Sequence, residues 1–395
     1  MTELHLHMTK LTWINILHFY QPPTADNETV ILAAEKSYKR IIGALKRNPK
    51  IKFTVNLAGC LLEKSDKLGY QNLISDIKML HDNRQIELTG TAAFHSLLPL
   101  LPAGEIKRNI ETNQAILKKY FGESFSPAGF FSPELAYSAG LAAIIKSYGY
   151  QWLMLDEISA MGELNKINFT KSYREKNTGL KICFRSRALS RSYTAKTIFN
   201  LINGGFTGTA ITATDAELYG LRHEDHSGTF EKLLHRSELE TKTVSEFLAG
   251  LPDEIAISPI ASSWESTQAE LKKGLPYALW QNKNNKIQKL LWQLAELAIG
   301  TVNGHQADRN YSWARHHLDR GLASCTFWWA SARDFELFGG LAWNPDEIER
   351  GLNELIRSIR ALTAPDSKQA KIAGEKLYIK IKTLIWHKHW HYYWK

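Results

Sequence analysis

Two acidic side chains in this 395-residue sequence directly follow short apolar runs of the kind that form buried strands. Glu134 follows the run 128–131, with Pro133 in front of it to direct the side chain, and Asp215 follows the run 209–214. Two facing carboxyl groups are the minimum set for cleaving a glycosidic bond, because one attacks the anomeric carbon while the other protonates the leaving oxygen. Either acid alone is also compatible with capping the next helix.

Polar and aromatic side chains also stand where other predicted strands end. The residues at these positions include His18 and Gln21 after the first strand, His95 after the third, Glu217 beside Asp215, and Trp264 after the seventh. In a parallel barrel the reactive groups gather at the carboxyl ends of the strands. Recurrence at several strand ends therefore predicts a functional site, whereas one such residue alone indicates little.

The elements that position these residues alternate between short strands and longer helices. The predicted strands are 13–18, 52–57, 85–89, 128–131, 151–155, 209–214 and 255–260. The predicted helices between them include 33–47, 104–120, 141–148 and 228–237. This alternation is typical of parallel β-α-β units, and seven such units favour a barrel over an open sheet. The segment 166–189 is interpreted as an insertion that interrupts the pattern.

Strand patterns stop near residue 265, and longer helical patterns follow. The predicted helices of this second part are 281–299, 312–330, 345–362 and 367–387. Asn344 and Pro345, followed by two acids, are typical of a helix start. We therefore predict an α/β chain with two domains: a catalytic (β/α)7 barrel over 1–265, with an insertion near 160–190, and a C-terminal helical bundle over 266–395.

The composition is that of a globular protein, with 44% hydrophobic and 23% charged residues. The net charge of +9 is spread along the chain without a basic run, so we expect no nucleic-acid partner. Three widely spaced cysteines predict neither a disulfide framework nor a zinc site. Without a signal-like segment or a long apolar run, we expect a soluble, cytoplasmic protein that has no membrane partner. The oligomeric state is left open.

Five segments in sequence order resemble glycoside hydrolase family 57, which contains retaining amylases, branching enzymes and glucanotransferases. The segments are LHFYQPP (17–23), IELTGTAAFHSLLPLLP (86–102), GFFSPELAYSAGL (129–141), TDAELYG (214–220) and SSWE (262–265). The resemblance implies a distorted seven-stranded barrel, with a helical C-terminal domain, that acts on α-linked glucans. It also implies that Glu134 is the nucleophile and Asp215 the acid/base of a double displacement that needs no metal or cofactor.

The same resemblance implies a set of substrate-binding residues. The polar members, which would hold sugar hydroxyls or tune the carboxyl groups, are His18, Gln21, Glu87, His95 and Glu217. The aromatic members, which would stack on sugar rings, are Trp264, Trp328 and Trp329. Buried polar groups with satisfied hydrogen bonds and ordinary core packing are the alternative interpretations.

The sequence departs from the family motifs at two places, and two alternative functions are left open at this stage. Tyr20 stands where the family usually has a second histidine, and Phe131 and Ser132 replace a Trp-Leu pair. A metal-dependent polysaccharide deacetylase on a related barrel is one alternative, although the HxxxH spacing that such a metal site needs is missing. A non-catalytic glycan-binding protein is the other, and it would be favoured if one of the two carboxyl groups were absent.

Overall fold

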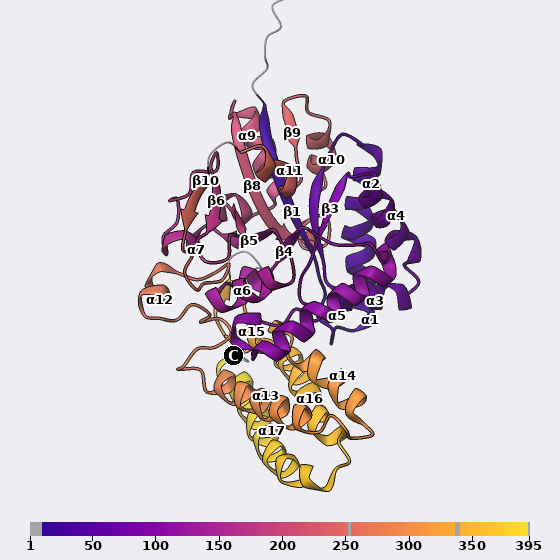
Figure 1. Ribbon diagram of the computed structural model, residues 1–395, viewed down its shortest axis with the longest axis vertical. Coiled ribbons are helices and arrows are strands. Elements are labelled where there is room, and N and C mark those ends of the chain that lie inside the picture. Colours follow the sequence, from indigo (N-terminus) through magenta and orange to yellow (C-terminus); the bar gives the residue numbers. More distant parts are fainter. Residues whose placement is uncertain (1–9, 252–253, 336–339, 394–395) are drawn as a thin grey trace, which may run out of the picture. The chain divides into compact units, whose positions relative to one another are not determined.

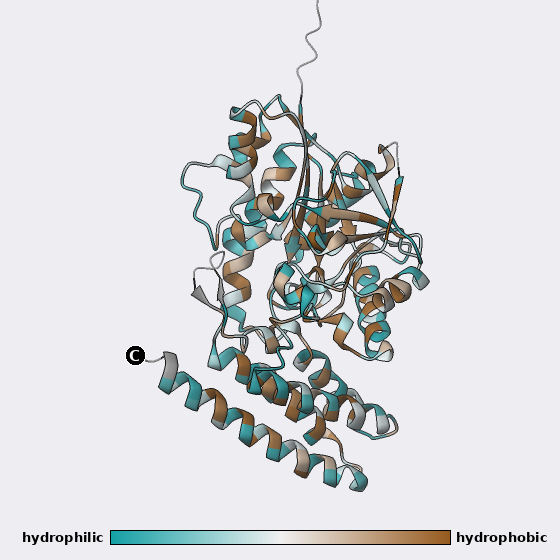
Figure 2. Ribbon diagram, turned by 90° about the vertical axis from the view of Figure 1, so that its left-hand side faces the viewer, coloured by the Kyte–Doolittle hydropathy of each residue, from teal (hydrophilic) through white to brown (hydrophobic). Residues whose placement is uncertain are grey.

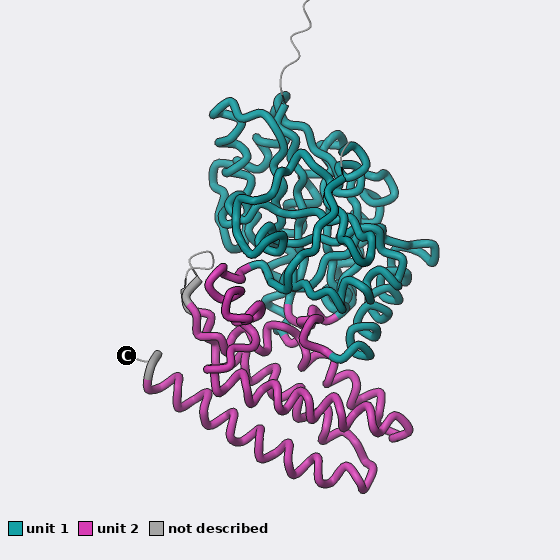
Figure 3. The backbone as a smooth tube through the Cα atoms, turned by 60° about the vertical axis from the view of Figure 1, so that its left-hand side comes forward, with its two compact units in different colours: residues 1–21, 25–93, 102–264 teal, residues 22–24, 94–101, 265–395 magenta. Residues whose placement is uncertain are grey.

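The computed structural model describes residues 10–251, 254–335 and 340–393. Contacts divide the chain into two compact units (Figure 3). The barrel unit comprises Met1–Gln21, Ala25–Ala93 and Pro102–Trp264. The helical unit comprises Pro22–Thr24, Phe94–Leu101 and Glu265–Lys395. Within the described residues, no helix is both long enough and apolar enough to span a bilayer.

The barrel unit is built on two sheets. The first has the order β3-β2-β1-β8, with β9 beside the start of β1, and all of its pairs are parallel. The second has the order β10-β6-β7-β5-β4, in which only the pair β6–β7 is antiparallel. The strands are β1 (Leu11–Phe19), β2 (Phe53–Leu57), β3 (Ile86–Thr89), β4 (Gly129–Phe131), β5 (Trp152–Asp156), β6 (Ser172–Glu175), β7 (Lys181–Arg185), β8 (Gly208–Asp215), β9 (Leu239–Thr241) and β10 (Glu254–Ile257).

The two sheets meet at both edges. After β3, Gly90 donates to Gly129 O at 2.8 Å and accepts from Phe131 N at 2.9 Å, which joins β3 to β4. After β7, Ser186 N donates to Ile211 O of β8 at 2.9 Å. At Gly90 an added Cβ would lie 2.2 Å from the Tyr150 hydroxyl, so only glycine permits this approach. The strands β1, β2, β3, β4, β5, β7 and β8 thus form the predicted distorted (β/α)7 barrel, which is confirmed.

The seventh barrel strand differs from the sequence prediction. The segment 166–189, interpreted as an insertion, contains β7, which pairs in parallel with β5 over its whole length. The predicted strand 255–260 is wrong as a barrel member, because β10 pairs with β6 at the outer edge of the second sheet. Ile255 is 42% exposed there. A short apolar run at a sheet edge has the same pattern as a buried strand, which explains the error.

Alternate residues of the barrel strands fill its interior. Ile14 and Ile16 of β1, Ile211 and Ala213 of β8, and Met154 of β5 belong to one buried cluster. Helix α11 (Val244–Ala249) adds three apolar side chains to this cluster. The barrel strands are mostly hydrophobic, as expected for parallel strands that are covered on both faces (Figure 2).

Helices surround the barrel strands (Figure 1). Those of the barrel unit are α1 (Asn27–Ala33), η1 (Ala34–Tyr38), α2 (Lys39–Arg47), α3 (Gly59–Lys67), α4 (Gln71–Asp82), α5 (Ala103–Phe121), η3 (Pro133–Leu135), α6 (Ala139–Ser147), α7 (Ile158–Met161), α8 (Arg187–Ser190), α9 (Thr194–Asn203), η4 (Ala216–Leu218), α10 (Thr229–Leu234) and α11. The predicted helix 33–47 begins earlier than expected, and η1 is a π-helical turn within it. Such turns are frequent at functional sites.

The helical unit contains helices and an antiparallel pair of short strands, β11 and β12. Its elements are η2 (Leu98–Leu100), α12 (Gln268–Lys272), α13 (Lys286–Gly304), α14 (Tyr311–Gly321), α15 (Ser324–Trp328), β11 (Asp334–Phe335), β12 (Gly340–Leu341), α16 (Pro345–Ala361), η5 (Pro365–Ser367), α17 (Lys368–Lys388) and η6 (His389–Tyr393). The single helix predicted over 312–330 is wrong, because Ala323 is extended and forms a bridge with Ser96. That bridge separates α14 from α15.

Candidate active site

Glu134 is held in an unusual backbone conformation at the end of β4. Its φ is 61°, and Leu135 follows with a φ of 46°. Residues other than glycine adopt this left-handed region at a cost of about 1–3 kcal/mol and keep it only where the surroundings enforce it. Here the Ser132 hydroxyl donates to Ala136 O at 2.6 Å, and the Leu135 side chain is buried in the barrel core. The turn therefore fixes the direction of the Glu134 side chain.

Trp264 holds the carboxyl group of Glu134. Its indole Nε1 donates to Oε2 of Glu134 at 2.8 Å, and its backbone N donates to Glu134 O at 3.0 Å. The Trp264 ring also packs against the barrel core. From the sequence we predict Trp264 as a sugar-stacking surface. The structure adds a contact that this prediction does not include: the Trp264 indole donates to the Glu134 carboxylate and positions it.

Asp215 ends β8 in register with His18 of β1. The His18 ring is buried and stacks on Phe131 of β4, with ring centroids 5.0 Å apart, and on Tyr20 at 5.5 Å. Its Nδ1 donates to Oδ1 of Asn56 at 2.6 Å. Burial lowers the pKa of His18 despite the nearby Asp215 carboxylate, so the ring is neutral at pH 7. His18 therefore links the strand that carries Asp215 to the strand that precedes Glu134.

Glu217 is buried beside Asp215 among polar partners. Gln21 Nε2 donates to its Oε1 at 2.8 Å, and the Tyr38 hydroxyl donates to the same oxygen. Burial, together with the Asp215 carboxylate, raises the pKa of Glu217 to about 7, while Arg222 acts in the opposite direction. Burial and the Glu217 carboxylate in turn raise the pKa of Tyr38 well above its usual value. A proton is thus held next to Asp215 at neutral pH.

The π-helical turn η1 places Tyr38 against this site. Within η1, the Ser37 hydroxyl donates to Ala216 O in the turn that carries Glu217. Just beyond that turn, Gly220 has a φ of +132°, and an added Cβ would lie 2.2 Å from Lys36 O. Glycine is therefore required for the close packing of this loop on η1.

Arg185, at the end of β7, joins β8, which carries Asp215, to Trp264, which holds the Glu134 carboxyl group. Its Nη1 donates to Ala213 O of β8 at 2.7 Å, and its Nη2 donates to Trp264 O at 3.4 Å. Its Nε donates to Asp156 Oδ2 at 2.8 Å, and Arg187 Nη2 lies 2.7 Å from Asp156 Oδ1. All three charged side chains are nearly or fully buried. This ion cluster forms a rigid support at the ends of β5 and β7.

Four predicted residues have other contacts in the structure. Glu87 is not brought to the carboxyl pair: it lies within β3 and accepts from Ser245 N at 3.0 Å, in the first turn of α11. His95 belongs to the helical unit, where its Nδ1 and the Ser324 hydroxyl are 3.0 Å apart. In the same unit the half-buried rings of Trp328 and Trp329 form an edge-to-face pair, with centroids 4.4 Å apart. For these four residues, a role in binding substrate stays a prediction.

The structure adds residues that the sequence interpretation missed. Asn56, Tyr38 and Arg185 each contact a predicted site residue or the segment that carries it. Asn56 carried a signal, since a polar residue in the middle of a buried strand needs a partner. Tyr38 lies on a helix 179 residues before Glu217 and carried none. Among the described residues, no three His, Cys, Asp or Glu side chains are grouped so as to hold a metal ion.

Comparisons with known proteins place this geometry in a family. The chain is 23% identical over 151 residues to alpha-amylase 1 of Dictyoglomus thermophilum, covering 38% of this chain and 22% of that protein. It is 20% identical over 286 residues to an alpha-amylase of Pyrococcus horikoshii, covering 67% of this chain and 44% of that protein. The chain thus spans less than half the length of both relatives.

A solved structure shares the fold over nearly the full length. The GH57-type branching enzyme from Pyrococcus horikoshii superposes with a TM-score of 0.68 at 15% identity, covering 95% of this chain and 94% of that one. The sequence profile of glycosyl hydrolase family 57 matches residues 6–258 of this chain. Because that match covers more than half of the sequence, the chain belongs to glycosyl hydrolase family 57.

Proposed function

We propose that this protein is a retaining glycosidase or glucanotransferase that acts on α-linked glucans, with Glu134 as nucleophile and Asp215 as acid/base. One observation carries the proposal: both carboxyl groups stand at the carboxyl ends of barrel strands, and shared neighbours link them. Arg185 bonds to β8 and to Trp264, and Trp264 bonds to Glu134. His18 is paired with Asp215 and stacks on Phe131.

The mechanism follows from the chemistry of two carboxyl groups. A Glu134 oxygen bonds to the anomeric carbon while the glycosidic C–O bond breaks, and the Asp215 proton moves to the leaving oxygen. Water or a sugar hydroxyl then attacks the anomeric carbon, its proton passes to Asp215, and the bond to Glu134 breaks. Two inversions retain the configuration. We expect the two carboxyl groups to work at a separation of about 5–5.5 Å.

Neighbouring side chains have supporting roles in this proposal. Because His18 is neutral and donates through Nδ1, its Nε2 is an acceptor suited to a sugar hydroxyl. Gln21 and Glu217 sit beside Asp215, where they can bind hydroxyls or influence the acid/base. We also propose a cytoplasmic location. Whether water or a sugar is the main acceptor depends on how the site excludes water, so both reactions belong to the proposal.

The direct test measures products formed from maltoheptaose and amylose by the unaltered chain, Glu134→Gln and Asp215→Asn. We expect both variants to lose at least about 10³-fold in kcat while remaining folded. Glu163→Gln, which changes a half-exposed glutamate paired loosely with Lys166, is the matched control and should keep full activity. Smaller products alone indicate hydrolysis, whereas longer or branched products indicate transfer.

A second experiment isolates the nucleophile. An α-maltosyl fluoride has a leaving group that needs no proton, so Asp215→Asn should still complete the first step and accumulate an adduct. Mass spectrometry of a proteolytic digest should find the adduct on Glu134. An adduct on another residue would reassign the nucleophile. An unaltered chain that is inert on every α-glucan but deacetylates a sugar with added metal would refute the proposal.

A further inference from the structure

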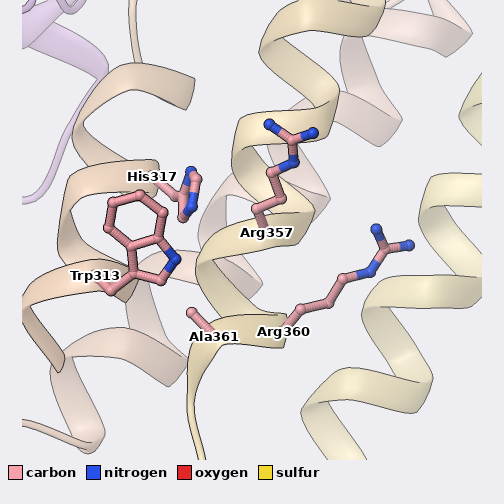
Figure 4. A pocket seen from close by; sticks show the side chains of 5 residues that line it. All are labelled: Trp313, His317, Arg357, Arg360 and Ala361. Atoms are coloured by element: carbon pink, nitrogen blue, oxygen red, sulfur yellow. The ribbon is translucent and has the colours of Figure 1, made fainter. Parts of the chain in front are cut away.

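A second set of residues suited to a sugar lies entirely within the helical unit. A pocket of about 360 Å³ is lined by Trp313 and His317 of α14 and by Arg357, Arg360 and Ala361 of α16. Figure 4 shows the aromatic side chains on one helix and the two arginines on the next. All five belong to the helical unit, whereas Glu134 and Asp215 belong to the barrel unit.

Trp313 is exposed although tryptophans are usually buried for the stability they add. Its side chain is 57% exposed, whereas Trp280 and Trp292 of the same unit are 0% and 6% exposed and fill the core. The Trp313 ring is nevertheless held in place, because it stacks parallel to His316 with centroids 5.2 Å apart and meets the His317 ring edge-on at 4.6 Å. A fixed and exposed indole is a ready surface for the apolar face of a flat ligand.

The polar side of the pocket carries two arginines that have carboxylate neighbours. Glu354 lies 2.7 Å from His317 Nδ1 and 3.8 Å from Arg357 Nη1. Arg360 donates through Nε and Nη2 to both oxygens of Glu375, at 2.6 and 2.7 Å. A guanidinium has five N–H donors, so Arg360 retains donors beyond these two bonds. The pocket thus combines a flat apolar wall with hydrogen-bond donors from two arginines.

Charge balance decides which ligand suits this pocket. Arg360 is matched by Glu375, and Glu354 lies close to both Arg357 and Arg320. Burial and the nearby Arg320 lower the pKa of His316, so this ring adds no charge at neutral pH. Arg357 and Arg360 thus each have a carboxylate neighbour, and a neutral ligand can bind without displacing these ion pairs. A neutral sugar ring fits this pocket, because its apolar face matches the Trp313 indole and its hydroxyls match the N–H donors of the arginines.

We infer that Trp313, Arg357 and Arg360 form an accessory binding site for the pyranose rings of a neutral glucan chain, separate from the carboxyl site. One ring stacks on the Trp313 indole, and its hydroxyls accept from the two guanidinium groups. That the sugar is an α-glucan rests on the proposed function; the stacking site itself does not. Such a site favours long chains over short ones, because it adds a second point of attachment.

The test is affinity electrophoresis in native gels that contain amylose, run with Glu134→Gln as the parent so that the polymer survives. Adding Trp313→Ala should weaken binding about tenfold, since the stacking surface is lost. Arg357→Ala should weaken it less. Trp390→Ala is the matched control, because Trp390 is also an exposed tryptophan of this unit, at 51% exposure, and its loss should change nothing.

Three results would overturn the inference: no retardation of the parent by amylose, equal retardation of the Trp313→Ala and Trp390→Ala variants, or displacement of amylose by millimolar inorganic phosphate. Turnover of maltotriose by chains with intact Glu134 separates this inference from the proposed function. Trp313→Ala should leave that turnover unchanged. If neither maltotriose nor any longer α-glucan is turned over, the proposed function fails, and the gels still decide whether Trp313 binds glucan.

Discussion

Two acidic groups at strand ends of the same barrel have opposite surroundings. Asp156, at the end of β5, is fully buried between Arg185 and Arg187, which lie 2.8 and 2.7 Å from its oxygens. Asp215, at the end of β8, is half-buried and faces His18, a neutral ring, and Glu217, another carboxyl group. The first arrangement pairs a carboxylate with two guanidinium groups, and the second places a carboxyl group beside another carboxyl group.

This difference distinguishes a structural carboxylate, Asp156, from a proposed catalytic one, Asp215. An ion pair between buried partners holds loops in place, while a carboxyl group beside another carboxyl group has an adjustable protonation state. Strand-end position alone did not distinguish the two aspartates, since both directly follow buried strands. Four predictions test the difference between structural and proposed catalytic side chains, from the largest expected effect to the smallest.

Asp156→Asn should lower the free energy of unfolding by about 3–5 kcal/mol, because it removes the carboxylate charge that pairs with two buried guanidinium groups. Asp215→Asn, at the half-buried position, should change stability by less than about 1 kcal/mol. Urea denaturation of both variants measures the contrast. Equal losses of stability would show that the two aspartates have the same structural role.

Glu217→Gln should stabilise the chain by about 3 kcal/mol at pH 8, because the buried carboxylate no longer has to ionise. The pKa of Glu217 is raised to about 7 in the fold, above the usual 4.5, so the folded state binds more protons between these values. Stability of the unaltered chain therefore falls as pH rises from about 4.5 through 7. The amide oxygen still accepts from Tyr38 and Gln21. Thermal melts of both chains at pH 4.5 and pH 8 measure the effect, and a gain that is the same at both would contradict this explanation.

Trp264→Phe should reduce kcat about tenfold by removing the indole donor to Glu134, while the ring continues to pack on the barrel core. Stability should change little. Steady-state kinetics on maltoheptaose measures the effect, with Trp390→Phe as the control for an exposed tryptophan. Unchanged kcat in Trp264→Phe would mean that this hydrogen bond does not position the nucleophile.

Glu87→Gln should cost about 1 kcal/mol of stability, because its carboxylate accepts from the Ser245 backbone N in the first turn of α11. Activity per folded molecule should stay the same, in contrast to Glu134→Gln. Denaturation and kinetics measured on one preparation separate the two effects. A large loss of kcat without a loss of stability would return Glu87 to the substrate-binding set.

Local pattern was enough to predict much of this protein. The strands β1, β2, β3, β4, β5 and β8, and the proposed catalytic pair after β4 and β8, follow from apolar runs and the residues directly behind them. These features depend on neighbours within a few positions, and such neighbours are visible in sequence. The motifs around Glu134 and Asp215 likewise resemble the family because they are contiguous.

The tertiary structure decided whatever depends on distant residues or on burial. Trp264 reaches Glu134 across 130 positions, and Tyr38 reaches Glu217 across 179. The raised pKa of Glu217 comes from desolvation, which no local pattern reports. β7 and β10 could not be told apart from the sequence, because an apolar run occurs both in barrel strands and in strands at an exposed sheet edge. Which side chains meet, and how deeply they are buried, depends on chain packing, and that packing separates the supporting Asp156 from Asp215.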